Sequence, residues 1–243
     1  MIRVHHSVDE LNHSVADFFA RTARDAVNSR GRFSVALSGG SSPRGAYELL
    51  AGPPYNEQVP WENVHVFWGD ERCVPIDDPH SNAGNALRVF LDKVSIPPHQ
   101  VHPMYNGQTS AEAAADYEVI LQRYFGDDPP RFDLIFLGLG ENGHTASLFP
   151  NQPALHEEKR WVMAVNIPDQ EMKERLTLTA PIINLGRNVA FILFGEKKAE
   201  TLKKVIEGPR NPDLLPAQLI APENGQLQFL VDESAASLLT GAG

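Results

Sequence analysis

Four short apolar segments, each followed by glycine or charged residues, constrain the fold of this 243-residue chain more than any other feature. They are Phe33–Leu37, Val64–Trp68, Phe132–Leu137 and Val189–Phe194. Apolar runs this short are typical of buried strands in a parallel sheet. Two further strands are predicted over Trp161–Val165 and Leu227–Val231, and helical patterns cover residues 7–30, 83–94 and 109–125. The alternation predicts a single α/β domain over residues 1–243 with a mostly parallel sheet.

The loop after the first segment has the composition of an anion site. It reads Ser38-Gly39-Gly40-Ser41-Ser42-Pro43, with Pro43 at the expected first position of a helix and Ser42 as its N-cap. Free backbone N–H groups at a helix start attract anions. No G-K-[ST] follows, so the loop is not a Walker A motif. A plain strand-to-helix turn is the alternative, but two glycines bracketed by serine hydroxyls favour phosphate binding.

The loop after the third segment contains a histidine. Gly138, Gly140 and Gly143 precede His144, and a helix is expected to begin at Ala146-Ser147-Leu148. The glycines match G-x-G-x-x-G, but Glu157 and Glu158 precede the next apolar run instead of ending it, which argues against a dinucleotide site. The structural alternative is a tight turn in which the histidine only caps or packs.

Charged residues follow the other two segments. Asp70, Glu71 and Arg72 form the expected loop after Trp68, and Lys197 and Lys198 follow Gly195. Arginine offers a planar fork for an oxyanion, carboxylate or phosphate, and the aspartate can orient a histidine or a water. A charged triplet in a loop is more often simply solvated, and either lysine is a candidate cation. If the sheet is parallel, all four loops meet at one edge, where the set suits acid–base chemistry on a phosphorylated small molecule.

Composition excludes several classes of protein. The formal net charge of −10 argues against nonspecific binding to nucleic acid or anionic membranes. The single Cys73 allows no intrachain disulfide. The N-terminus has no signal-peptide pattern, no apolar run is long enough to span a membrane, and no histidine spacing is typical of a metal site.

Four motifs resemble the 6-phosphogluconolactonase family over nearly the whole chain. They are SGGSSPRGAYELL, FWGDERCVP with HSN, GLGENGHTASLFP, and RLTLTAPIINLGRNVAFILFGEKKAETL. The resemblance implies a Rossmann-like three-layer α/β/α sandwich shared with glucosamine-6-phosphate isomerase/deaminase. It implies hydrolysis of 6-phospho-D-glucono-1,5-lactone to 6-phospho-D-gluconate in the oxidative pentose phosphate pathway, without a metal or cofactor. A cytoplasmic monomer with a small sugar-phosphate substrate, and no nucleic-acid or membrane partner, is the expected form.

The resemblance also implies roles for individual residues. His144, in the G-H-T-A-S-L motif, is the expected general base, and Asp70 and Arg72 of the D-E-R motif help to position water and substrate. Phosphate is expected to bind the S-G-G-S loop, the lysine of the G-x-x-K motif and the arginine of the R-x-T-L motif. In this chain these are Ser38, Gly39, Gly40, Ser41, Lys198 and Arg175. A helix N-terminus beside His144 is expected to keep the imidazole neutral.

Two alternatives remain to be tested. The related isomerase/deaminase has a glutamate five residues after the histidine, where this chain has Phe149, and an aromatic residue in the third place of its D-E-R triplet. A noncatalytic sugar-phosphate sensor attached to a regulator would normally have a basic DNA-binding helical arm. The N-terminal helix is too short for such an arm and is not basic.

Overall fold

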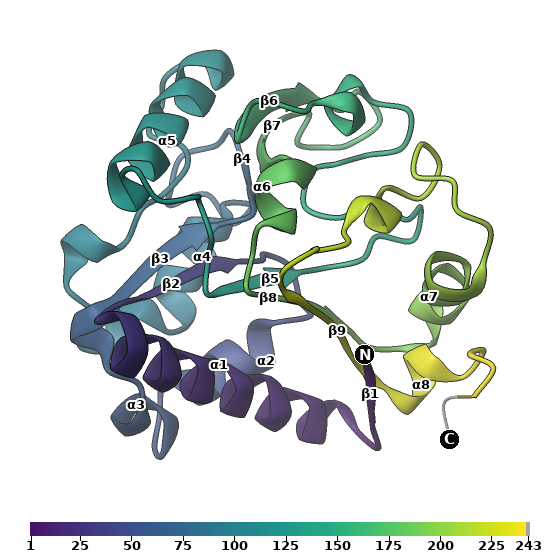
Figure 1. The fold of residues 1–243 in the computed structure, drawn as a ribbon, viewed down its shortest axis with the longest axis horizontal. Coiled ribbons are helices and arrows are strands. Elements are labelled where there is room, and N and C mark those ends of the chain that lie inside the picture. Colours follow the sequence, from purple (N-terminus) through teal and green to yellow (C-terminus); the bar gives the residue numbers. More distant parts are fainter. Residues whose placement is uncertain (242–243) are drawn as a thin grey trace.

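The computed structural model describes residues 1–241 and has a six-stranded parallel sheet with helices on both faces (Figure 1). In spatial order the strands are β1 (Ile2–His5), β9 (Gln226–Asp232), β8 (Asn188–Leu193), β5 (Leu134–Leu137), β2 (Phe33–Leu37) and β3 (Val64–Trp68). The order of the strands changes direction between β2 and β5. Strand β3 lies on the outer side of β2, whereas β8 lies on the opposite side, next to β5. Ligands of open α/β sheets bind at such a switch point. The predicted parallel sheet is confirmed.

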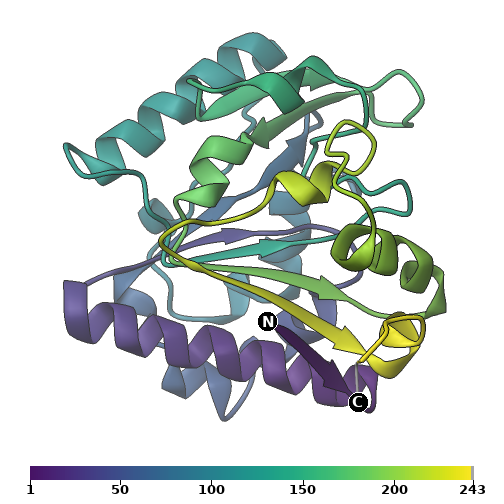
Figure 2. The same cartoon turned by 45° about the vertical axis from the view of Figure 1, so that its right-hand side comes forward.

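Helices cover the two faces as separate layers (Figure 2). The helices are α1 (Val8–Arg30), α2 (Arg44–Leu50), α3 (Tyr55–Gln58), α4 (Asn82–Val89), α5 (Ser110–Phe125), α6 (Ala180–Asn184), α7 (Ala199–Glu207) and α8 (Glu233–Ala236). The long helix α1 lies under one face, while α6 and α5 lie on the other side. Ser7 caps α1 by accepting a hydrogen bond from the Glu10 N–H at 3.1 Å. The three-layer α/β/α expectation is therefore confirmed.

The structure corrects the sequence analysis at the D-E-R segment. Asp70–Arg72 is not a loop but the strand β4, which pairs antiparallel with β7 (Glu174–Leu178), and β7 pairs with β6 (Val162–Asn166). These three strands form a second sheet. The reason is non-local: β4 finds its partner about a hundred residues further along the chain, which a reading of local pattern cannot detect.

Three further boundaries differ from the predictions. The first strand, β1, was not predicted; its Ile-Arg-Val-His alternation spans only four residues, and its apolar side chains Ile2 and Val4 are exposed. The helix expected over 83–94 ends at Val89 and is followed by a 3₁₀ turn over Leu91–Lys93. No helix begins at Ala146, whose φ of 47° lies in the left-handed region. A turn that closes with Leu148 N–H donating to Thr145 O at 2.9 Å stands there instead.

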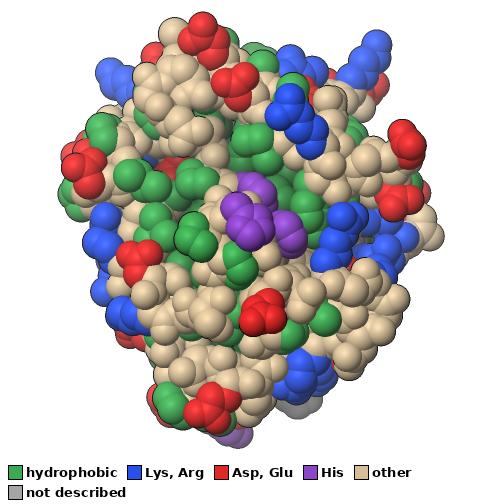
Figure 3. Space-filling view, turned by 90° about the vertical axis from the view of Figure 1, so that its left-hand side faces the viewer, with side chains coloured by type: hydrophobic (Ala, Val, Ile, Leu, Met, Phe, Trp, Pro, Cys, Tyr) green, Lys and Arg blue, Asp and Glu red, His purple; other side chains and the backbone are tan. Residues whose placement is uncertain are grey.

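The edge strand β3 is covered by a loop that carries histidines. Val101 forms an isolated parallel bridge with Val66, and the rings of His65 and His102 lie parallel with centroids 5.6 Å apart. Histidine side chains gather at the centre of the face on the β3 side of the molecule (Figure 3). Such a cover protects the open edge of a sheet from pairing with another chain.

Candidate active site

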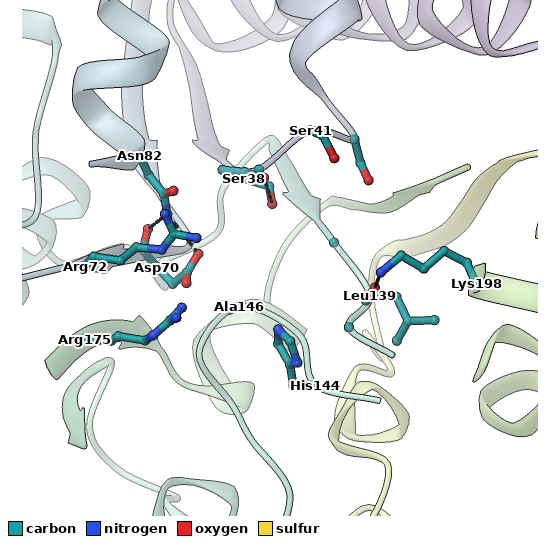
Figure 4. A pocket seen from close by; sticks show the side chains of 15 residues that line it. Ser38, Ser41, Asp70, Arg72, Asn82, Leu139, His144, Ala146, Arg175 and Lys198 are labelled. Atoms are coloured by element: carbon teal, nitrogen blue, oxygen red, sulfur yellow. Dashed lines mark hydrogen bonds between the residues drawn. The ribbon is translucent and has the colours of Figure 1, made fainter. Parts of the chain in front are cut away.

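A cleft of about 220 Å³ opens at the carboxyl ends of β2, β5 and β8 (Figure 4). It is lined by Ser38–Ser42, Asp70, Arg72, Asn82, Gly138–Gly140, His144, Ala146, Arg175 and Lys198. Every residue to which the family resemblance assigned a role is in this set. Loops from both sides of the β2–β5 switch point form its walls, as the topology requires. The cleft contains three cations and a single carboxylate, in a chain whose net charge is −10.

The Ser38–Ser42 loop forms one wall. The Tyr47 hydroxyl fixes its start, because it donates to Ser38 O at 3.0 Å and accepts from Ser38 N–H at 3.2 Å. The helix that follows begins at Arg44 with Pro43 as its N-cap, and no side chain caps it. The prediction that Ser42 is the N-cap is therefore wrong by one residue. The side chains of Ser38 and Ser41 lie above the cleft in Figure 4.

Gly39 allows a buried amide to enter this wall. A Cβ on Gly39 would lie 1.8 Å from Asn82 Oδ1, so any other residue would displace that side chain. Asn82 is 2 % exposed, and its Oδ1 has no hydrogen-bond partner among residues 1–241. A buried acceptor without a partner costs free energy unless a ligand or water donates to it. The sequence analysis assigned no role to Asn82, although this residue directly precedes the helix predicted over residues 83–94.

Glu71 explains how Asn82 is held. The Glu71 carboxylate accepts the backbone N–H groups of Asn82 and Ala83 at 2.7 and 2.8 Å and the Ser81 hydroxyl at 3.2 Å. The side chain therefore binds the N-terminus of α4, where free N–H groups need acceptors. Burial raises the pKa of Glu71, and these backbone N–H donors oppose the rise. The middle residue of the D-E-R motif thus has a structural role that the motif alone does not reveal.

Asp70 lies on the wall of the cleft and is 8 % exposed. Its Oδ2 accepts a hydrogen bond from Ser147 Oγ at 2.7 Å, and its Oδ1 accepts a long one from Asn82 Nδ2 at 3.4 Å. No hydrogen bond joins Asp70 to His144 in the described part of the chain. The carboxylate therefore does not orient the histidine by a direct hydrogen bond.

Arg72 and Arg175 lie opposite each other in the second sheet. Arg72 donates from Nη1 to His80 O at 2.6 Å, and Arg175 donates from Nε to Met172 O at 2.9 Å. These neutral partners orient the two guanidinium groups without neutralising them. Like charges that face each other across a ladder are destabilising, so the pair favours an anion in the cleft. Figure 4 shows both side chains on the same side as Asp70, across the cleft from Lys198.

His144 is held by its own loop. The Asn142 Oδ1 atom lies 2.6 Å from His144 Nδ1 and accepts the His144 backbone N–H at 3.2 Å. A backbone N–H only donates, so this amide atom must be the oxygen, and Nδ1 must then carry the ring proton. The Nε2 atom is left with a free lone pair. Asparagine often bonds to the backbone two residues further on, so the G-E-N-G-H spacing contained a signal for Asn142 that the sequence analysis missed.

Two neighbours fix the plane of the His144 ring. The ring stacks on Phe149 with centroids 4.1 Å apart and an interplanar angle of 13°. A Cβ on Gly140 would lie 2.0 Å from His144 Nδ1, so this glycine leaves the space that the imidazole occupies. The middle glycine of G-x-G-x-x-G therefore accommodates a side chain instead of a pyrophosphate.

The surroundings of His144 keep its imidazole neutral. Burial lowers the pKa of His144 to about 4; Asp70 opposes this shift, whereas Arg175, Lys198 and Arg72 contribute to it. The predicted cause, a helix N-terminus, is wrong, because no helix begins beside the histidine. The predicted consequence is the same: a neutral base at pH 7.

Lys198 lies across the cleft from the arginines (Figure 4). Its Nζ donates to Leu139 O at 2.8 Å, which leaves two of its three protons for a ligand. Lys197 is exposed and is not part of the lining. The structure therefore decides between the two candidate lysines in favour of Lys198.

Residues 1–241 contain neither a metal-binding cluster nor a membrane-spanning helix. No group of three or more His, Cys, Asp or Glu side chains could hold a metal ion. No helix within the same range is long and apolar enough to cross a bilayer.

Comparison with known proteins gives the family. The model of the family "Glucosamine-6-phosphate isomerases/6-phosphogluconolactonase" matches residues 6–229. The 6-phosphogluconolactonase of Synechocystis sp. is 41% identical over 218 residues, which cover 88% of each chain. A protein of Oryza sativa subsp. indica named probable 6-phosphogluconolactonase 2 is 35% identical over 251 residues, with 98% of this chain and 89% of the relative covered.

A solved structure agrees with these sequence matches. The 6-phosphogluconolactonase of Trypanosoma brucei superposes with a TM-score of 0.86 at 28% identity, over 99% of this chain and 98% of that one. The match extends beyond the loops of the cleft to every layer of the fold. The chain therefore belongs to the glucosamine-6-phosphate isomerase/6-phosphogluconolactonase family.

Proposed function

We propose that this protein hydrolyses 6-phospho-D-glucono-1,5-lactone to 6-phospho-D-gluconate, the second step of the oxidative pentose phosphate pathway. The observation that carries the proposal is a neutral histidine with a free Nε2, in a cleft that also contains three cations. A lactone ring needs a base to activate water, and its phosphate needs cations. The relatives named 6-phosphogluconolactonase match 98% and 88% of this chain.

The proposed reaction begins with general-base catalysis. His144 Nε2 takes a proton from a water molecule, and the water oxygen attacks C1 of the lactone. The carbonyl π electrons move to the oxygen, and Arg72 stabilises the negative charge that develops there. The tetrahedral intermediate then expels the ring oxygen, to which the imidazolium returns its proton. Asp70 accepts the second proton of the attacking water as a hydrogen bond and so holds it in line.

The phosphate is proposed to bind the loop of Ser38, Gly39, Gly40 and Ser41 together with Lys198. Arg175, across the cleft, adds a further positive charge that helps to balance the charge of the phosphate. Its guanidinium also lies 5.5 Å from the centroid of the Phe149 ring, so it contacts the same residue that supports His144. No metal or cofactor is needed in this scheme, since the histidine supplies the base.

The deaminase alternative lacks a proton carrier at the required position. Phe149, five residues after His144, is 3 % exposed and stacks on the imidazole. An apolar ring in that position cannot move a proton between carbons. The apolar Phe149 in place of a glutamate therefore favours lactonase over deaminase activity.

One assay tests the proposed function. Freshly made 6-phosphogluconolactone is added to the purified protein, and acid release is followed above the spontaneous rate, with ammonia measured in parallel from glucosamine 6-phosphate. We expect acid release that survives chelation of metals and falls by about 10²–10⁴-fold in His144→Ala. The exposed His99→Ala is the matched control. Absence of lactonase activity would refute the function, and ammonia release would identify a deaminase.

Three further statements belong to this proposal. Residues 1–243 act as a single α/β lactonase domain, since the cleft draws residues from position 38 to position 198. The active form is a monomer, because every group that the scheme uses comes from one chain. The enzyme acts in the cytoplasm on a small molecule, without a nucleic-acid or membrane partner. Light scattering of the active fraction tests the monomer directly.

A further inference from the structure

Four arginines line a second cavity at the edge of the sheet opposite the cleft. Arg30 and Arg32 precede β2, Arg131 precedes β5, and Arg187 precedes β8. The N-terminal ends of these parallel strands lie together on the left of Figure 2, away from the loops of the candidate active site. The cavity has a volume of about 590 Å³. These four side chains are called the arginine cluster below.

One buried carboxylate pairs with part of the arginine cluster. Asp133 Oδ1 accepts hydrogen bonds from Arg30 Nε at 3.1 Å and from Arg30 Nη2 at 2.8 Å. Its Oδ2 accepts the N–H and the hydroxyl of Ser34 at 2.9 and 3.1 Å. The only other acidic residue of the lining is Asp128. Two carboxylates thus face four guanidinium groups, and one of the carboxylates is already fully occupied.

Neutral groups hold two other members of the arginine cluster in place. Arg131 donates to Leu185 O at 3.1 Å and to Asn224 O at 2.6 Å. Arg32 donates to Tyr124 O at 3.1 Å and lies over the Tyr124 ring, 4.4 Å from its centroid. Backbone carbonyls fix a guanidinium in space but leave its charge unbalanced. These contacts therefore preorganise positive charge around the cavity.

The fourth member, Arg187, forms an ion pair, among the described residues, only with the carboxylate that Arg30 already occupies. No hydrogen bond from the Arg187 side chain is found within residues 1–241, and its Nε is buried, 3.4 Å from Asp133 Oδ1. Burial lowers the pKa of Arg187, and the charges of Arg30 and Arg131 lower it further. A cation that lines a cavity close to like charges, with a buried N–H that makes no hydrogen bond, is a group that an anion would stabilise.

We propose that the arginine cluster binds an oligophosphate anion at a site separate from the catalytic cleft. Guanidinium forks match phosphate oxygens two at a time, and four of them around one cavity favour a ligand with several adjacent charges. A single carboxylate would leave most of these donors unused. The cavity is also larger than the cleft proposed to hold a sugar phosphate. The chemistry suits free oligophosphate and the phosphate chain of a nucleotide alike.

Calorimetric titration with tripolyphosphate and with ATP tests the proposal. The test variant is Arg32→Gln/Arg131→Gln, which spares the two arginines that contact Asp133. The matched control, Arg21→Gln/Arg24→Gln, removes the same charge from exposed positions of α1. We expect the test variant to bind tripolyphosphate roughly ten-fold or more weakly than wild type, because two charge-assisted contacts are lost. The control should bind within about two-fold of wild type, since distant exposed charges are screened.

The cleft must be distinguished from the arginine cluster, because both attract phosphate. All titrations are therefore repeated in a Lys198→Ala background, and lactone turnover of the test variant is measured. The two sites lie at opposite ends of strands about 16 Å long, beyond the screening length of about 8 Å at physiological salt. Turnover should be unchanged. Equal affinities of the test and control variants would overturn the proposal, as would binding that Lys198→Ala alone abolishes. If tripolyphosphate binds more tightly than ATP, the ligand is a free oligophosphate. If ATP binds more tightly, the ligand is a nucleotide.

Discussion

At the scale of single residues, the cleft separates two groups of cations. Arg72 and Arg175 lie together on one side, whereas Lys198 lies on the other beside the β5 loop (Figure 4). A substrate with a phosphate at one end and a carbonyl at the other has two places where negative charge must be stabilised. The separation gives each place its own cations, which makes the roles of the two groups testable.

The first prediction concerns the phosphate. Lys198→Ala should raise KM by roughly ten-fold or more with little change in kcat, because a charge-assisted contact made equally in ground and transition states is lost. Arg175→Ala should raise KM less. Steady-state kinetics with fresh lactone measure both values, and Lys197→Ala is the control. An unchanged KM in Lys198→Ala, or a larger rise in Arg175→Ala, would assign the phosphate to the arginine side.

The second prediction concerns the tautomer of His144. Asn142→Ala removes the acceptor that holds the proton on Nδ1, so the lone pair no longer stays on Nε2. We expect kcat to fall by roughly ten- to a hundred-fold, less than the about 10²–10⁴-fold loss from removing the base itself. Thermal unfolding should change little because Asn142 is exposed. Asn142→Asp, which keeps the acceptor, should recover part of the activity. Full activity of the alanine variant would exclude the role.

The third prediction follows from the pKa of about 4 for His144. The base works only when unprotonated, so activity should fall on acidification through about pH 4 and not through 6.5, the ordinary pKa of histidine. The titration of the imidazole C–H signals by NMR, with His144→Gln for assignment, measures the value without substrate. A bound phosphate dianion would oppose the three cations and raise this pKa. A midpoint near 6.5 in the free protein would contradict the burial of the ring.

At the scale of elements, the position of α4 depends on β4. The Glu71 carboxylate, in the middle of a three-residue strand, binds the first N–H groups of the helix. This contact sets Asn82 against the Ser38–Ser42 loop, where only a glycine at position 39 leaves room for it. Three elements that are separate in sequence thus meet at one amide group. Their packing, and not any one motif, shapes this wall of the cleft.

The fourth prediction tests that contact. A methyl group in Gly39→Ala would overlap Asn82 Oδ1 and displace either the amide or the phosphate loop. Since a shift of about 1 Å at a substrate-positioning group can cost about 10²-fold, we expect a fall in kcat/KM of roughly that size. Gly52→Ala, which meets open space, should be fully active. In a double-mutant cycle, Gly39→Ala should cost much less in an Asn82→Ala background. Additive effects of the two substitutions would show that they do not share a contact.

At the scale of the whole molecule, three histidines are kept neutral by the fold. Burial lowers the pKa of His65, His102 and His144 to about 4 in each case. For His65 the charge of Arg32 contributes as well, and His65 contributes to the shift of His102. Two of the three belong to the covered edge of β3 and the third to the cleft. Protonation therefore opposes folding at two distant places.

The fifth prediction is that stability falls as the pH is lowered from about 6.5 to about 4. In that window the unfolded chain binds protons that the folded chain excludes, so the free energy of unfolding must decrease on acidification. Urea denaturation at several pH values measures the slope. His65→Gln/His102→Gln should flatten it, whereas the exposed His99→Gln should not. If the free energy of unfolding depends on pH as steeply in the double variant as in wild type, protonation of His65 and His102 is not the cause.

Local pattern predicted much of this molecule. The strands Phe33–Leu37 and Val64–Trp68 have the predicted bounds, and the helix after Ser7 begins where its cap indicates. These elements follow from apolar periodicity and from capping, which are properties of neighbouring residues. The parallel sheet then implied that Ser38, His144 and Lys198 meet at one edge. That inference needed only the direction of the strands.

The sequence by itself determined which residue types follow each strand, because a buried strand must end in a loop at the surface. Only the tertiary structure decided how those residues meet. Arg72 faces Arg175 through a second sheet, and Asn82 approaches Gly39 because Glu71 binds the start of a helix. The physical reason is that such contacts join segments tens to a hundred residues apart. The geometry of these contacts depends on how whole helices and strands pack, and local periodicity does not predict that packing.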